Sequence, residues 1–185
     1  MKLEGVPCIM FLNKAVFCWI LFGCSVCNIN VAQDLSTSFI EWNEQDALEW
    51  NDFRFRKGKS EKTNIAITTV RLSARGYMKN GVPDFEVKAL FVKQESWTTD
   101  STDIALLQHE QLHFDIGELY AQKIREKIDE LKSEGEQSPK VYRGAINNLI
   151  TLFKAYSGQY DSDTEHGTIQ KRQIVWNQRI NKLLY

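Results

Sequence analysis

One run of apolar residues in the second half of the chain limits the fold more than any other feature of the sequence. From residue 104 to about residue 133, apolar side chains recur at roughly helical spacing: Ile104, Leu107, Leu112, Ile116, Leu119, Ile124, Ile128 and Leu131. Asp103 stands where an N-cap is expected. The pattern predicts one long helix whose apolar stripe must be buried against other elements.

The residues before this helix have the pattern of β-strands. Four apolar side chains alternate with the residues between them: Phe85, Val87, Ala89 and Phe91. Such alternation is typical of a strand with one buried face. Asn80-Gly81, just upstream, suits the positive φ angles of a tight hairpin turn. We therefore expect at least one antiparallel hairpin within residues 65–97.

The residues after the long helix predict two more helices. Residues 134–139 interrupt the apolar pattern, and a second helix is expected from about residue 140 to residue 155. Residues 156–161 are expected to form a loop, after which Asp163 or Thr164 caps a third helix. The sequence thus predicts an α+β domain over residues 34–185, with a small antiparallel sheet followed by three helices.

Residues 1–33 have the composition of an export signal. Lys14 precedes about a dozen mostly apolar residues, and Ala32 offers a small residue for cleavage. A lipoprotein signal with lipidated Cys24 is one alternative, and an uncleaved membrane anchor is another. Each interpretation predicts an exported protein, periplasmic or extracellular. All four cysteines lie in this segment, so the domain has no disulfide or thiolate metal ligand.

The long helix carries the motif His109-Glu110-Gln111-Leu112-His113. Histidines four residues apart lie on one helical face, where both imidazoles can bind the same ion. Zinc lowers the pKa of a bound water to about 7, and a neighbouring glutamate can take that water's proton. The spacing predicts a Zn²⁺ site with His109 and His113 as ligands and Glu110 as the catalytic base. An accidental match on an amphipathic helix is the alternative.

A catalytic zinc usually has three protein ligands and one open position. His166 is the third histidine of the chain, and Gly167 beside it permits a close approach of backbones. We predict His166 as the third ligand, the alternative being a surface histidine near a helix start. Four carboxylates remain as other candidates for that position: Glu118, Asp161, Asp163 and Glu165.

Two residues are candidates for supporting roles. Asp115 is expected either to accept a hydrogen bond from a ligand imidazole or to be an exposed helix carboxylate. Tyr160 is expected to donate to the oxyanion that forms when water attacks a carbonyl, with a packed aromatic side chain as the alternative.

Taken together, these segments resemble the bacterial family DUF922, a domain of unknown function whose members are described as predicted secreted zinc-dependent proteases. The similarity lies in residues 48–53, 109–116 and 160–167 and in the signal-like N-terminus. The resemblance implies a zincin-like fold, in which the motif helix packs against a small sheet whose edge binds an extended peptide. It also favours His166 as a ligand.

The expected function is that of a zinc-dependent hydrolase of the cell envelope, in the first place a metallopeptidase with a peptide or protein substrate. The same site could cleave another amide or an ester. The alternative class is a non-catalytic peptide-binding or assembly protein with a structural or vestigial zinc. The formal net charge is −1, so no basic surface supports nucleic-acid binding. The oligomeric state is left open.

Overall fold

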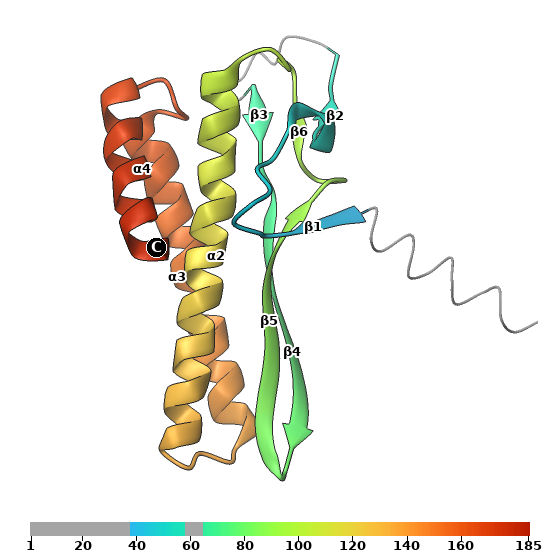
Figure 1. Cartoon of the computed structure of the whole chain (residues 1–185), viewed down its shortest axis with the longest axis vertical. Coiled ribbons are helices and arrows are strands. Elements are labelled where there is room, and N and C mark those ends of the chain that lie inside the picture. Colours follow the sequence, from blue (N-terminus) through green and yellow to red (C-terminus); the bar gives the residue numbers. More distant parts are fainter. Residues whose placement is uncertain (1–37, 58–64) are drawn as a thin grey trace, which may run out of the picture. The chain divides into compact units, whose positions relative to one another are not determined.

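A computed structural model describes residues 38–57 and 65–185, and it confirms an α+β fold with a small antiparallel sheet and three helices (Figure 1). The predicted export segment, including Cys24, lies outside these described residues.

The antiparallel sheet is built on the predicted hairpin. Its strands are β1 (Phe39–Glu41), β4 (Val70–Lys79) and β5 (Val82–Val92), in the order β1-β5-β4. Asn80 and Gly81 form the turn with φ angles of 53° and 81°, as their positions predicted. The alternating residues of β5 point their apolar side chains into the core, where Val87, Ala89 and Phe91 are buried.

A second sheet of very short strands lies beside the start of the long helix. It consists of β2 (Arg54–Phe55), β3 (Ala66–Ile67) and β6 (Trp97–Thr98) in the order β2-β6-β3. β6 pairs in parallel with β2 and antiparallel with β3. β3 is therefore an edge strand of this sheet. A 3₁₀ turn, η1 (Trp50–Asp52), precedes β2.

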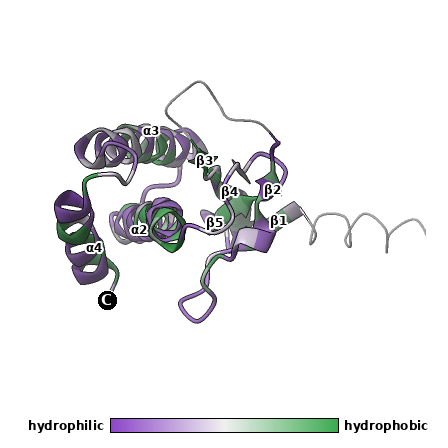
Figure 2. Cartoon of the chain, turned by 90° about the horizontal axis from the view of Figure 1, so that it is seen from above, coloured by the Kyte–Doolittle hydropathy of each residue, from purple (hydrophilic) through white to green (hydrophobic). Residues whose placement is uncertain are grey.

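The long helix α2 (Ile104–Ser133) lies at the centre of the fold, as its apolar stripe requires. Asp103 caps it by accepting a hydrogen bond at 3.0 Å from the amide of Leu106. One side of α2 packs against β5 and the start of α3 (Pro139–Thr164). Another packs against the end of α3 and against α4 (Gln170–Leu184). Figure 2 shows α2 between the strands and α4.

The last two helices differ from the sequence prediction. Residues 156–161 were expected to form a loop, but α3 continues through them to Thr164. Buried Phe153 and Tyr160 recur at helical spacing and pack against α2, which offsets the low helix propensity of exposed Gly158. The third helix begins at Gln170 rather than near Asp163. Among the described helices, none is both long and apolar enough to cross a membrane.

Candidate metal centre

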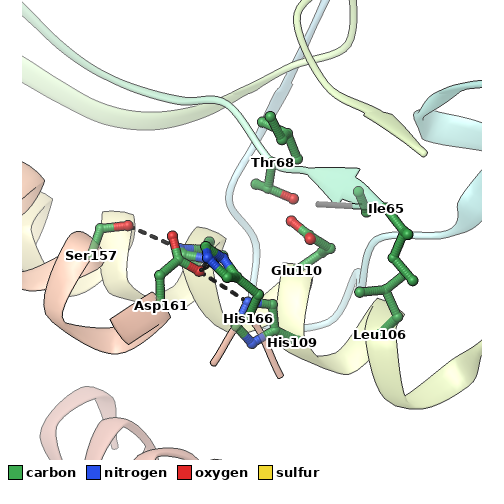
Figure 3. Close-up of a pocket in the computed structure, with 11 residues that line it drawn as sticks. Ile65, Thr68, Leu106, His109, Glu110, Ser157, Asp161 and His166 are labelled. Carbon is green, nitrogen blue, oxygen red and sulfur yellow. Dashed lines mark hydrogen bonds and ion pairs between the residues drawn. The ribbon is translucent and has the colours of Figure 1, made fainter. Parts of the chain in front are cut away.

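The two histidines of the motif are buried side by side on α2. The exposed fraction is 2% for His109 and 7% for His113, and their ring centroids are 5.0 Å apart. The Nε2 atoms of both rings approach one carboxylate oxygen, Oδ1 of Asp161, at 3.2 Å and 3.0 Å (Figure 3). Within the described parts of the chain, these three residues form the group that could hold a metal ion.

Asp161 reaches this group because α3 extends further than predicted. Ser157 and Asp161 are four residues apart, so both face α2 from one side of α3. Ser157 Oγ lies 2.9 Å from Nδ1 of His113, and Asp161 lies between the two Nε2 atoms. Asp161 was one of the carboxylate alternatives, and a helical interpretation of residues 156–164 would have placed it with Ser157 on this face.

The other nitrogen of His109 is held by a residue that the sequence did not reveal. Nδ1 of His109 lies 3.0 Å from Oε1 of Gln173 on α4, and the same oxygen accepts a hydrogen bond at 2.9 Å from the hydroxyl of Tyr160. The amide nitrogen of Gln173 donates to Asn177 at 2.7 Å, which orients the side chain. A glutamine 64 positions from its partner carries no local sequence signal.

The ring of Tyr160 packs against both imidazoles. Its ring stacks on His109 at 4.6 Å between centroids and meets His113 edge-on at 4.8 Å. Its buried hydroxyl lies within hydrogen-bonding distance of Gln173 and of the main-chain carbonyl of His109. Burial raises the pKa of Tyr160 above its ordinary value, so the phenol stays protonated. Tyr160 thus has a packing role here, and the oxyanion role stays a prediction.

His166 lies at the edge of the same group, on a tight connection between α3 and α4. Residues 165–167 all have positive φ angles, of 47°, 55° and 84°, and the last of them is Gly167. A Cβ atom added at Gly167 would lie 2.9 Å from Cγ of His109, so the predicted close approach exists. Nδ1 of His166 is 3.4 Å from Oδ1 of Asp161, and the His166 side chain is 44% exposed.

Glu110 points into a pocket of about 180 Å³ beside the three ligand candidates. The side chain is 3% exposed, and its Oε2 atom has no hydrogen-bond partner in the described structure. Residues 65–68, in and around edge strand β3, form the opposite wall. Figure 3 shows the carboxylate of Glu110 turned toward this wall. The predicted base and the predicted ligands therefore share one pocket.

The protonation pattern of the group fits a bound cation. A neutral imidazole has one N–H, and Gln173 takes the one at Nδ1 of His109. The lone pair at Nε2 of His109 then faces the carboxylate of Asp161. Burial raises the pKa of Asp161, but positive charge and hydrogen-bond donation from the two imidazoles lower it by more, to well below its usual range; a cation bound at this point would supply that positive charge while Nε2 of His109 stays unprotonated. A positive charge between these atoms removes the repulsion.

The distances also fit a small metal ion. Zinc binds imidazole nitrogen and carboxylate oxygen at roughly 2.0–2.2 Å, so neighbouring ligand atoms around it are about 3.3 Å apart. The two separations to Asp161, 3.0 Å and 3.2 Å, are close to that value, and all three candidate ligand atoms lie within 4.8 Å of one another. The carboxylate of Asp161 would balance one charge of a divalent cation held between the two imidazoles.

The remaining candidates lie elsewhere. Asp115 does not meet an imidazole; its Oδ1 accepts hydrogen bonds from Trp42 at 2.9 Å and from Gln111 at 2.8 Å. Glu118 forms an ion pair with Arg125. Asp163 accepts from Nε1 of Trp176 at 3.2 Å. Asp115 was expected either to accept a hydrogen bond from a ligand imidazole or to be an exposed helix carboxylate. The structure shows neither, because the carboxylate is partly buried and bonds to Trp42 and Gln111.

Fold and site together define an α+β protein with a buried His-His-Asp group that could bind a metal ion. The sequence model of DUF922, a bacterial protein family of unknown function, matches residues 42–167, which contain the whole group. The chain belongs to this family. Neither a curated protein nor a solved structure matches it.

Proposed function

We propose that this protein is a zinc-dependent hydrolase, and specifically a metallopeptidase with a zincin-like arrangement of motif helix and edge strand. The observation that carries the proposal is the convergence of His109, His113 and Asp161 on one point beside Glu110, whose buried Oε2 atom has no hydrogen-bond partner among the described residues. A purely structural metal site has no use for a carboxylate with a buried, unpaired oxygen at its side.

Zinc is the metal that this donor set favours. Two imidazoles and one carboxylate make a borderline set of ligands, and three protein ligands leave a coordination position open for chemistry. Gln173 and Ser157 would hold the Nδ1 atoms of the two histidines by hydrogen bonds, which fixes the orientation of each imidazole toward the metal. When bound, the metal supplies a Lewis acid that polarises a carbonyl and lowers the pKa of water.

The protein's own residues account for the other steps of hydrolysis. Glu110 is placed to accept the proton of the attacking water and to return it to the leaving group. Among the described strands, none pairs with the second edge of β3, and β3 lines the same pocket. An extended peptide can bind such an edge through main-chain hydrogen bonds. These two features favour a peptide or protein substrate.

The position of His166 supports a second candidate function. Its Nδ1 atom is 3.4 Å from Asp161, close enough for a small movement to make it a fourth ligand. Four protein ligands would close the site, as in a structural zinc site. The protein would then be a non-catalytic binding or assembly protein.

We further propose that the protein works in the cell envelope and that residues 1–33 are its export signal. This segment is either a cleaved signal peptide or, as the alternative, a lipoprotein signal in which Cys24 is lipidated.

Zinc content tests the proposal directly. We expect about one zinc per purified chain, lost on His113→Ala and on Asp161→Ala but kept on His166→Ala. Loss of zinc from all three variants while they remain folded would favour the closed, non-catalytic site. A parent protein that binds no added zinc would end the proposal.

Hydrolysis is tested with Glu110→Gln, which keeps the shape of the side chain and removes the base. The variant should keep its zinc and lose at least about 100-fold in the rate at which it cleaves a peptide library. Equal rates for the variant and the parent would exclude Glu110 as the base.

A further inference from the structure

Two buried polar atoms without hydrogen-bond partners face each other across the candidate pocket. Among the described residues, the buried side-chain atoms that lack a partner are Trp50 Nε1, Thr68 Oγ1 and Glu110 Oε2. Thr68 and Glu110 both line the pocket, Thr68 from the residue directly after β3 and Glu110 from α2. In Figure 3 the hydroxyl of Thr68 and the carboxylate of Glu110 point toward one another. Buried polar groups rarely remain unpaired, so the pair indicates a ligand group that bonds to both.

Thr68 and Thr69 point in different directions. The next residue, Thr69, is turned the other way: its amide donates to Oγ of Ser96 at 2.9 Å, and its hydroxyl to the carbonyl of Glu95 at 3.4 Å. The carbonyl of Thr69 accepts from the amide of Val92 at 2.9 Å. Thr69 is thus anchored away from the pocket, whereas Thr68 beside it lines the pocket.

We propose that Thr68 binds the N–H of the scissile bond, and that the site therefore prefers amides to esters. This inference rests on the proposed hydrolase function and specifies its substrate class. When water adds to an amide carbon, the nitrogen has one N–H and one lone pair. An N–H bonded to Thr68 Oγ1 leaves the lone pair directed at Glu110 on the opposite wall.

The step balances on these residues. The water oxygen bonds to the carbonyl carbon, and the water proton moves to Glu110. Glu110 passes that proton to the nitrogen lone pair, the C–N bond breaks with its electrons on nitrogen, and a carboxylic acid and an amine leave. An ester offers an oxygen with no hydrogen at the same position, so Thr68 has nothing to accept.

The test compares two analogues of one alanine tripeptide on the zinc-loaded protein by calorimetry. A phosphonamidate has a tetrahedral phosphorus with an N–H leaving group, and the matching phosphonate ester has an oxygen in its place. We expect the parent to bind the phosphonamidate about tenfold more tightly, the effect of one well-placed hydrogen bond. Thr68→Val should remove this preference, and Thr68→Ser should restore it.

Thr69→Val is the matched control, because it changes the neighbouring side chain that faces away from the pocket. It should keep the full preference. An equal preference in folded Thr68→Val and in the parent would overturn the inference, and so would equal binding of the two analogues by the parent. If neither analogue binds a protein that holds zinc, the proposed hydrolase function fails, and this inference fails with it.

Discussion

Gln173 is the residue on which the orientation of His109 depends most directly. Its Oε1 atom accepts from the imidazole and from the hydroxyl of Tyr160, and it is buried with both. We predict that Gln173→Leu, which keeps the approximate size of the side chain, weakens zinc binding by about 10- to 100-fold. Competition with a chromophoric chelator measures this affinity.

Gln178→Leu serves as its control, since Gln178 is exposed on the same helix. That variant should bind zinc as the parent does. An unchanged affinity in folded Gln173→Leu would mean that the imidazole is held well enough by Tyr160 and by packing alone.

Gly167 tests the contact between the α3–α4 connection and His109. Its φ of 84° is unfavourable for any residue with a Cβ, and that Cβ would meet the His109 ring at 2.9 Å. We predict that Gly167→Ala lowers the free energy of unfolding by about 2–3 kcal/mol and weakens zinc binding. Urea denaturation and chelator competition measure the two effects.

Gly135→Ala separates backbone strain from the clash. Gly135 has a φ of 75° but nothing within 4 Å of an added Cβ. Its substitution should cost about 1 kcal/mol and leave zinc affinity unchanged. Equal losses for the two alanine variants would show that the contact with His109 is of no consequence.

At the scale of elements, Gly117 sets the approach of α2 to the hairpin. A Cβ at Gly117 would lie 2.5 Å from Cγ1 of Val70 on β4. Alanine is the better helix former by about 1 kcal/mol, but the clash should outweigh that gain. We predict that Gly117→Ala lowers the free energy of unfolding by about 1–3 kcal/mol, and that Val70→Ala partly rescues it. Urea denaturation measures both.

Gly144→Ala is the control, and it should change the free energy of unfolding in the opposite direction. Gly144 lies within α3 and has nothing within 4 Å of an added Cβ. Its substitution should raise the free energy of unfolding by about 0.5–1 kcal/mol. Stabilisation by Gly117→Ala as well would mean that α2 and β4 can move apart freely.

The far end of the hairpin is tied to α2 by an ion pair between Asp84 and Lys132. The hydrogen bond from Lys132 lowers the pKa of Asp84 below 3.8, although burial opposes it. A carboxyl with a lowered folded pKa adds stability above its unfolded pKa and loses it as pH falls through the folded value. Asp84→Asn should therefore cost about 1–2 kcal/mol at pH 7, and the difference should shrink below about pH 4.

Urea denaturation at several pH values between 7 and 3 measures the difference in the free energy of unfolding between Asp84→Asn and the parent. Asp129→Asn is the control, because Asp129 is 76% exposed and lies 3.6 Å from the same lysine. It should change stability by no more than about 0.5 kcal/mol. A constant difference between Asp84→Asn and the parent at all these pH values would contradict the assignment.

Over the whole molecule, the sequence predicted what local periodicity determines. The hairpin turn at Asn80 and the helix start at Asp103 follow from short-range geometry, and the structure confirms both. The end of α3 does not follow, because Gly158 argues against a helix locally and only packing against α2 favours it. Asp161 joins two histidines some fifty residues upstream only through that packing. The placement of His109 and His113 is thus determined by local helix geometry, whereas the placement of Asp161 depends on tertiary packing.

Because the candidate ligands lie on different helices, we expect a bound metal to stabilise the whole fold. Its candidate ligands come from α2 and α3, and residues of α4 and the α3–α4 connection support them. A ligand that binds only the folded state raises stability by RT ln(1 + [L]/Kd), about 4 kcal/mol at a thousandfold excess over Kd. We predict that removal of zinc with a chelator lowers the melting temperature by several degrees, and that restored zinc reverses the change. Folded His113→Ala, which lacks one ligand, should melt at the same temperature with and without chelator. If neither chelator nor added zinc changes the melting temperature of the parent protein, no metal links these helices.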